Sequence, residues 1–346
     1  MIKKSGGLFQ FMIIDVFNHI LPPKYLKELN KRLVNSWHAA RSLAHAKSVV
    51  TLSDLEARFR IMDKYPGLCQ VLTIASPPME DITPPKDAIE LATIANDELA
   101  ELVFKYPDRF PAAIACLPFC DMDASLKELD RALKDLRFRG VQVFTHNKKM
   151  PLDSSEYLPL YERMVFYDLP ILIHPDRLAT TPDYEGETDS KYLIWTTLGW
   201  PHATSTAMMR LAGSGIFERF PSIKFITHHA GGTIPYLINR ITGSNEFNEM
   251  RMHYRYDQHL TKRMTDYLHM FYNDTAVYGC TSGLMCAHAF YGTERLLFAT
   301  DMPFDCQNGD KLIRETIRSV NEMTISNAEK KQIFEENARK MFLLPE

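Results

Sequence analysis

The sequence predicts an α/β protein folded as a (β/α)8 barrel, the TIM barrel. Eight short apolar runs recur along its 346 residues, and a helix-like segment follows nearly every run. The runs are almost continuously apolar rather than alternating, which is typical of parallel strands covered on both faces. An open, doubly wound sheet is the alternative, but no glycine-rich phosphate loop follows the first run. The chain length also suits a barrel of about 250 residues with insertions.

Each apolar run has the length of a strand, and the first one, "MIIDVFNHILP", gives way to a histidine. The expected strands are residues 12–16, 68–75, 111–118, 140–145, 170–175, 223–229, 270–276 and 295–301.

Helical spacing of apolar residues marks the segments between the strands. Residues 86–107 carry such a pattern up to a proline, and residues 123–140 open on an aspartate cap and close on Gly140 as a helix stop. Residues 205–221 and 309–323 repeat the pattern. Helices therefore alternate with strands, as the barrel requires.

We expect one barrel domain over residues 1–346, with two helical insertions. Residues 23–50 form a basic segment after the first strand, and residues 243–269 form a polar excursion after the sixth. Both follow the carboxyl ends of strands, the face on which barrel enzymes build their active sites. They are candidates for lids or subunit contacts at the barrel mouth. Alternatively, they are solvent-exposed helices with no role in the site.

Composition excludes several classes of protein. A net charge of −3 with scattered basic residues argues against nucleic-acid and membrane partners. Residues 1–11 lack a secretory pattern, and no apolar run approaches the roughly 20 residues of a membrane span. The six cysteines show no CxxC pair, so we expect reduced thiols in a soluble, cytoplasmic protein.

Polar side chains gather where the expected strands end. His19, His174, the pair His228–His229 and Asp301 end the first, fifth, sixth and eighth strands. Each alone could be a satisfied core residue or a helix cap, but residues at these positions converge on the barrel mouth. Imidazoles and a carboxylate together suit zinc or another divalent ion. A further imidazole could act as a ligand or as a general acid/base.

These residues carry a family resemblance. The chain resembles the amidohydrolase superfamily (amidohydrolase-related family 2), and in particular its decarboxylase branch, typified by aminocarboxymuconate-semialdehyde decarboxylase and related aromatic acid decarboxylases. The similarity runs from Ile14 to about Asp310. Its markers include "IDVFNHILP", "LEARFRIMD", "LKELDRALKDLRFRGVQVFTH", "ILIHP", "GIFERFPSIKFITHHAGGTIPYLINRI" and "LLFATDMPF".

The resemblance implies one divalent metal, zinc or manganese, at the barrel mouth. It assigns His19, His174 and Asp301 as metal ligands and His229, with Asp301, as the catalytic acid/base group. Phe17 stands where the family has a further ligand, and phenylalanine cannot coordinate. Three outcomes stay open: three ligands hold the metal, His228 or His229 becomes a fourth ligand, or the metal is lost.

The function implied is metal-assisted, non-oxidative decarboxylation of a small aromatic or unsaturated carboxylic acid, which makes the protein a carboxy-lyase. A hydrolase or hydratase of a small carboxylate or lactone is the alternative. A metal-free or non-catalytic barrel is a third possibility, because Phe17 replaces a ligand. The implied partners are a small-molecule carboxylic acid and a second copy of the chain in a homodimer.

Other residues are candidates for contact with the substrate. Arg177 lies three residues after His174 and could form a bidentate ion pair with a substrate carboxylate. Asp274 could orient a ligand or His229, or cap the following helix, and Gly231 and Gly232 could serve a tight turn or admit substrate to the backbone. Further candidates are Arg251, Trp195 and His228, with Arg58, Arg60 and His202 as weaker ones.

Overall fold

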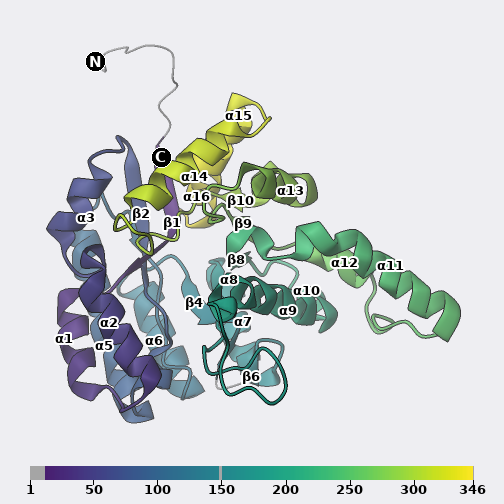
Figure 1. The fold of residues 1–346 in the computed structure, drawn as a ribbon, viewed down its shortest axis with the longest axis horizontal. Helices are drawn as coiled ribbons and strands as arrows, with labels where there is room; N and C mark the ends of the chain where they lie inside the picture. The colour runs from purple at the N-terminus through teal and green to yellow at the C-terminus, as the bar shows by residue number, and fades with distance from the viewer. Residues whose placement is uncertain (1–11, 148–149, 346) are drawn as a thin grey trace.

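A computed structural model describes residues 12–147 and 150–345, so the N-terminal residues 1–11 discussed above lie outside the described part (Figure 1). Eight strands coincide with the eight predicted runs: β1 (Ile13–Ile20), β2 (Leu68–Ile74), β3 (Ala112–Ala113), β4 (Val141–Phe144), β7 (Ile171–His174), β8 (Phe225–Thr227), β9 (Tyr272–Asp274) and β10 (Leu296–Leu297). The short strands β5 (His146–Asn147) and β6 (Met150–Pro151) form an antiparallel pair beside them.

The eight strands close into a barrel. Parallel pairing joins β1, β2 and β3 in one group and β10, β9, β8, β7 and β4 in another. Two parallel bridges connect the groups, from Ala115 to Val141 and from Asn18 to Met302. The predicted (β/α)8 barrel is therefore confirmed.

Helices surround the barrel and connect its strands (Figure 1). They are α1 (Pro23–Arg32), α2 (Trp37–Ser48), α3 (Leu55–Met62), α4 (Met79–Ile82), α5 (Pro85–Lys105), α6 (Met122–Lys134), α7 (Leu158–Tyr167), α8 (Ile194–Thr197), α9 (Gly199–Gly213), α10 (Ile216–Arg219), α11 (Ile234–Met252), α12 (Met264–Leu268), α13 (Thr281–Tyr291), α14 (Asp310–Glu322), α15 (Asn327–Lys331) and α16 (Asn337–Met341). No helix in the described residues is long and apolar enough to cross a membrane. All six cysteines are free thiols.

The predicted boundaries of one helix are wrong. Asp121, not Asp123, caps α6, because its side chain accepts a hydrogen bond from the Ala124 amide. The helix ends at Lys134, six residues before the predicted stop at Gly140. Gly140 instead begins the approach to β4, where a Cβ would lie 2.8 Å from the Pro170 carbonyl oxygen. Close packing between neighbouring strands therefore explains this glycine.

A β-bulge in β1 determines which side chains of this strand point into the barrel. Its pairing with β2 shifts register between Asp15 and Asn18, and Val16 and Phe17 both pack in the apolar cluster inside the barrel. Successive residues of a regular strand face opposite sides, so one extra residue is needed to place both inside. Phe17 and His19 consequently share the inner face at the carboxyl end of the strand.

On the outer face of the same strand, a polar network is buried between the barrel and α3. Arg58 of α3, 0% exposed, donates to Gln70, Asn18 and the His19 carbonyl oxygen at 2.6–2.8 Å. Asp15 accepts hydrogen bonds from Gln70 and from Thr300. Arg58 therefore anchors the backbone of β1 and does not face the cavity, which excludes its predicted contact with substrate.

The two segments that we predicted to be insertions contain helices. Residues 23–50 contain α1 and α2, and residues 243–269 contain the later part of α11, a connecting segment and α12. Figure 1 shows α11 extending away from the barrel on the side opposite α1.

Candidate active site at the barrel mouth

A cavity of about 240 Å³ opens at the carboxyl ends of the strands. Its wall combines charged groups with broad aromatic surfaces. It is lined by His19, Arg41, Ser76, Pro77, His174, Asp176, Arg177, Leu178, Ala179, Trp195, Thr196, Trp200, Tyr278, Asp301 and Phe304. Volume and lining suit a small, flat, anionic molecule.

Three of the predicted residues meet on this wall. His19 Nε2 lies 3.2 Å from an oxygen of Asp301, and the ring centroids of His19 and His174 are 5.2 Å apart. His229 adds a second imidazole to the carboxylate, with Nε2 3.6 Å from the other Asp301 oxygen. Residues at or shortly after the carboxyl ends of β1, β7, β8 and β10 are thus brought together, as predicted.

The donor atoms of these side chains fit a divalent metal. Neither ring nitrogen of His19 makes a hydrogen bond to a described residue, although the ring is buried. His174 Nδ1 lies 2.6 Å from the Pro175 carbonyl oxygen, which fixes the tautomer and leaves Nε2 with a lone pair. Two imidazoles and a carboxylate form a common three-ligand set. Within the described residues, however, no three His, Cys, Asp or Glu side chains lie close enough together to coordinate one metal ion as they stand.

The imidazoles and the carboxylate shift each other's charge state. Burial disfavours an ionised Asp301, but His19 and His229 outweigh it and hold the pKa of this carboxyl well below its usual range. Burial likewise opposes protonation of His229, yet Asp301 raises its pKa overall. Burial and the neighbours His19 and His228 lower the pKa of His174 far below normal. His229 is therefore the imidazole best placed to carry a proton, and His174 is neutral, as a ligand must be.

Phe17 fills the space among the histidines. Its ring is fully buried and stacks on His228 with a centroid distance of 3.3 Å and an interplanar angle of 13°. It also meets the edge of His19 at 4.5 Å and lies 5.4 Å from His174. Phe17 thus places an apolar ring at the position where the family resemblance implies a further ligand.

His228 does not reach the cavity, although it was a predicted substrate contact. It is 0% exposed and stacks beneath Phe17, with Nδ1 2.6 Å from an Asp274 oxygen. The other Asp274 oxygen accepts a hydrogen bond from the His229 amide at 2.8 Å. Asp274 therefore contacts both histidines, which agrees with the predicted role of orienting His229.

The turn that carries His229 has an unusual backbone. His229 has φ 58° and Asp301 has φ 61°, a region that non-glycine residues seldom adopt and that is found at functional sites. At Gly231, φ is 77° and a Cβ would lie 2.4 Å from the Tyr291 hydroxyl; at Gly232 it would lie 2.5 Å from the Pro201 carbonyl oxygen. Packing and turn geometry, rather than access for substrate, explain these two glycines.

Other predicted contacts divide into two groups. Arg177 and Trp195 line the cavity, and Arg177 is paired with Asp183 at 3.0 Å. Arg251 is exposed at the end of α11 and is not among the lining residues. Arg60 is exposed on α3, and His202 lines a neighbouring cavity instead.

Several lining residues escaped the sequence analysis. Asp176 is 4% exposed and its Oδ2 has no hydrogen-bond partner among the described residues. Its position two residues beyond His174 was a usable signal. Arg41 of α2 lies over the Trp195 ring at 5.0 Å, and Phe304 has its ring 5.4 Å from that of His19. No sequence pattern marks Arg41, because only folding brings the inserted helix to the mouth.

The barrel and this strand-end set define a class of protein. A family model described as amidohydrolase matches residues 34–344, and the chain belongs to this family. Among curated relatives, the gamma-resorcylate decarboxylase of Rhizobium radiobacter is 30% identical over 331 residues, covering 94% of this chain and 92% of the relative.

Solved structures give the same result more specifically. The structure of 2,6-dihydroxybenzoate decarboxylase complexed with 2,6-dihydroxybenzoate has a TM-score of 0.74 and 28% identity, covering 96% of this chain and 98% of that one. Dihydroxybenzoic acid decarboxylase from Polaromonas sp. JS666, with bound manganese and the inhibitor 2-nitroresorcinol, has a TM-score of 0.75 and 28% identity, with 96% of each chain covered. The protein is thus an amidohydrolase-family barrel similar to aromatic acid decarboxylases.

Proposed function

We propose that this protein is a metal-assisted, non-oxidative decarboxylase of a small aromatic carboxylic acid, and hence a carboxy-lyase. The observation that carries the proposal is the convergence of His19, His174 and Asp301 on one cavity, with His229 paired to Asp301 behind them. The similar decarboxylases support it, including one with bound manganese.

His19, His174 and Asp301 would hold a divalent metal, manganese or zinc. A bound metal of this kind polarises a substrate oxygen and stabilises negative charge that develops beside it. Three protein ligands suffice for a catalytic site, so Phe17 does not exclude a metal. The hydrogen bond from His174 Nδ1 to the Pro175 carbonyl keeps Nε2 directed at the shared site.

The remaining residues would bind the acid and manage the proton. The aromatic wall of Trp195, Trp200 and Phe304 suits a flat ring, and Arg41 and Arg177 place positive charge near a carboxylate. When the bond to the carboxylate carbon breaks, CO₂ leaves and its electron pair stays on the ring carbon. His229, protonated through its pairing with Asp301, then supplies the proton to that carbon.

The hydrolase or hydratase alternative uses the same residues with water as the attacking group. The relatives favour decarboxylation over it, and the strand-end set argues against a non-catalytic barrel. The test is incubation of manganese-loaded protein with 2,6-dihydroxybenzoate and other ring-hydroxylated benzoates, with CO₂ release measured. Metal-dependent release of one CO₂ per acid consumed is expected. No release from any acid, with hydrolysis of lactones instead, would overturn the proposal.

We further propose that the protein is a cytoplasmic homodimer joined through α11. Free cysteines are consistent with a reducing compartment. In this 19-residue helix only Ile234 is buried, whereas Phe247 and Met250 are 61% and 75% exposed. Clustered apolar side chains on a projecting helix are typical of an interface. The double variant Phe247→Glu, Met250→Glu should convert a dimer to a monomer in light scattering; a monomeric wild type would contradict the proposal.

A further inference from the structure

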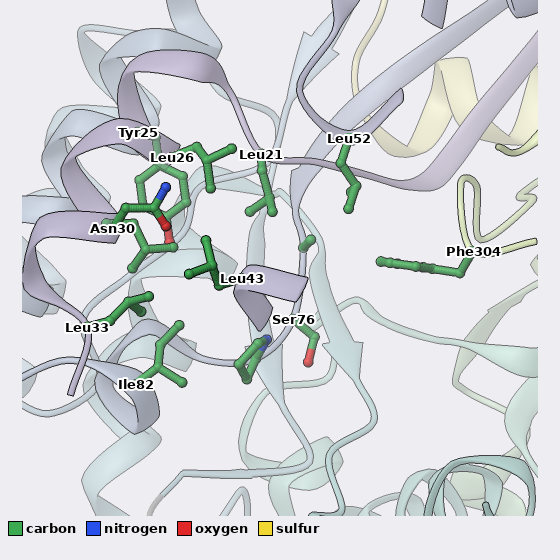
Figure 2. Close-up of a pocket in the computed structure, with 13 residues that line it drawn as sticks. Leu21, Tyr25, Leu26, Asn30, Leu33, Leu43, Leu52, Ser76, Ile82 and Phe304 are labelled. Atoms are coloured by element: carbon green, nitrogen blue, oxygen red, sulfur yellow. The ribbon is translucent and has the colours of Figure 1, made fainter. Parts of the chain in front are cut away.

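A second, apolar chamber adjoins the candidate active site (Figure 2). It lies between the inserted helices α1 and α2 and the carboxyl ends of β1 and β2. Leucines supply much of its wall: Leu21 after β1, Leu26 and Leu29 of α1, Leu33 directly after α1, Leu43 of α2, and Leu52. Several of them are buried yet face free space, which is unusual in a close-packed core.

The chamber is a neighbour of the site cavity, and three residues form a wall common to both. Ser76, Pro77 and Phe304 line both spaces, and the Phe304 ring stands 5.4 Å from the His19 ring. Figure 2 shows Phe304 pointing inward from the side opposite α1. A ring bound beside His19 would therefore have the chamber at its edge.

The two spaces differ in chemistry. The site cavity carries two arginines, two histidines and two aspartates on its wall. Among the described residues of the chamber wall no side chain is charged, and the polar ones are Tyr25, Asn30 and Ser76. A carboxylate placed there would lose its hydration without a partner, whereas an apolar group would gain from burial. The chamber thus selects for an apolar part of a ligand.

The free volume limits the size of that part. About 20 Å³ is open, room for one or two groups of the size of a water molecule. Such a space suits a methyl or ethyl group and not a second ring. Leu43 controls the volume from α2, the same helix that brings Arg41 to the site cavity.

We propose that the substrate is an aromatic carboxylic acid with a short alkyl substituent, and that the chamber between α1, α2 and the barrel binds this alkyl group. The inference rests on the proposed function, because the ring and its carboxylate must occupy the site cavity. The alkyl group enters past Phe304 and packs against Leu21, Leu43 and Leu52. Burial of one methyl group strengthens binding about fourfold.

The test compares 2-hydroxybenzoate with its 3-, 4-, 5- and 6-methyl isomers on the manganese-loaded protein. Calorimetry gives the affinity of each acid, and CO₂ release gives turnover. We expect one methyl isomer to bind about fourfold more tightly than the unsubstituted acid. The variant Leu43→Phe fills the chamber and should bring the ratio of the two affinities to about one. The variant Leu43→Ala enlarges it and should shift the preference to the ethyl counterpart.

Equal affinity for all five acids would overturn the proposal, as would a methyl preference that survives Leu43→Phe. These results are separable from failure of the proposed function. A preference that depends on Leu43 without CO₂ release would support the chamber and contradict decarboxylation. Release of CO₂ without any preference would contradict the chamber alone, and no binding of any acid would contradict both.

Discussion

The two faces of β1 carry buried polar groups in opposite states. On the outer face, Asp15, Gln70 and Arg58 satisfy one another through hydrogen bonds at 2.8–3.1 Å. On the inner face, both ring nitrogens of His19 and Nδ1 of His229 are buried without a hydrogen-bond partner. A satisfied network stabilises a fold, whereas buried groups without a partner cost free energy that a bound metal or ligand can recover. The difference supports our proposal that the inner face is the functional one.

The largest expected effect concerns the proton donor of the inner face. The variant His229→Asn should lower turnover by about 10²–10⁴-fold, the range for loss of a general acid. Metal content, measured on the same sample by atomic emission, should stay at the wild-type value, because the proposed ligand set does not include His229. Loss of metal from this variant would instead make His229 the fourth ligand.

The outer face should show its role in stability. The variant Arg58→Met leaves the Asn18, Gln70 and His19 carbonyl oxygens without their buried donor, so the free energy of unfolding should fall by about 3–5 kcal/mol. Arg60→Met on the same helix is the matched control, because Arg60 is exposed, and should stay within about 0.5 kcal/mol. Urea denaturation gives the free energy of unfolding of each variant. Equal losses for Arg58→Met and Arg60→Met would contradict a special role of the buried arginine in stability.

Asp15 should make stability depend on pH. Burial raises the pKa of Asp15 from 3.8 to about 7, against the opposing hydrogen bonds from Thr300 and Gln70. Between these two pH values the folded state holds a proton that the unfolded state has lost, so stability falls as pH rises, by up to ~1.4 kcal/mol per unit. Above pH 7 the contribution is constant.

The check is urea unfolding of wild type and Asp15→Asn at pH 5, 6 and 7. The stability difference between the two proteins should change over this range in favour of the variant as pH rises. A difference that is constant with pH would show that Asp15 is ionised throughout.

The smallest effect probes the position that departs from the family. The variant Phe17→His offers a third imidazole, and thus a fourth ligand, beside His19 and His174 and should tighten metal binding at least about tenfold, ~1.4 kcal/mol. Phe17→Leu is the control, since it removes the ring without adding a donor. Unchanged affinity in Phe17→His would mean that the bulge in β1 directs residue 17 away from the metal.

The sequence analysis predicted the barrel and its strand-end set well, for a physical reason. Parallel strands buried on both faces leave continuous apolar runs, and the polar residues at their ends stand out against them. His228 was misplaced because sequence does not show that His229 turns into a left-handed conformation, which separates the two side chains. Arg41 and the leucine chamber could not be predicted, since they depend on how the inserted α1 and α2 pack over the barrel.

The most direct test of the central claim is metal binding itself. Calorimetric titration of chelator-treated protein with Mn²⁺ should give one site per chain, and His174→Ala should lose it, because His174 contributes one of only three ligands. Its outer-face counterpart, Gln70→Ala, should keep the site despite lower stability. Absence of stoichiometric binding in the wild type, or equal binding in wild type and His174→Ala, would contradict a metal centre built from His19, His174 and Asp301.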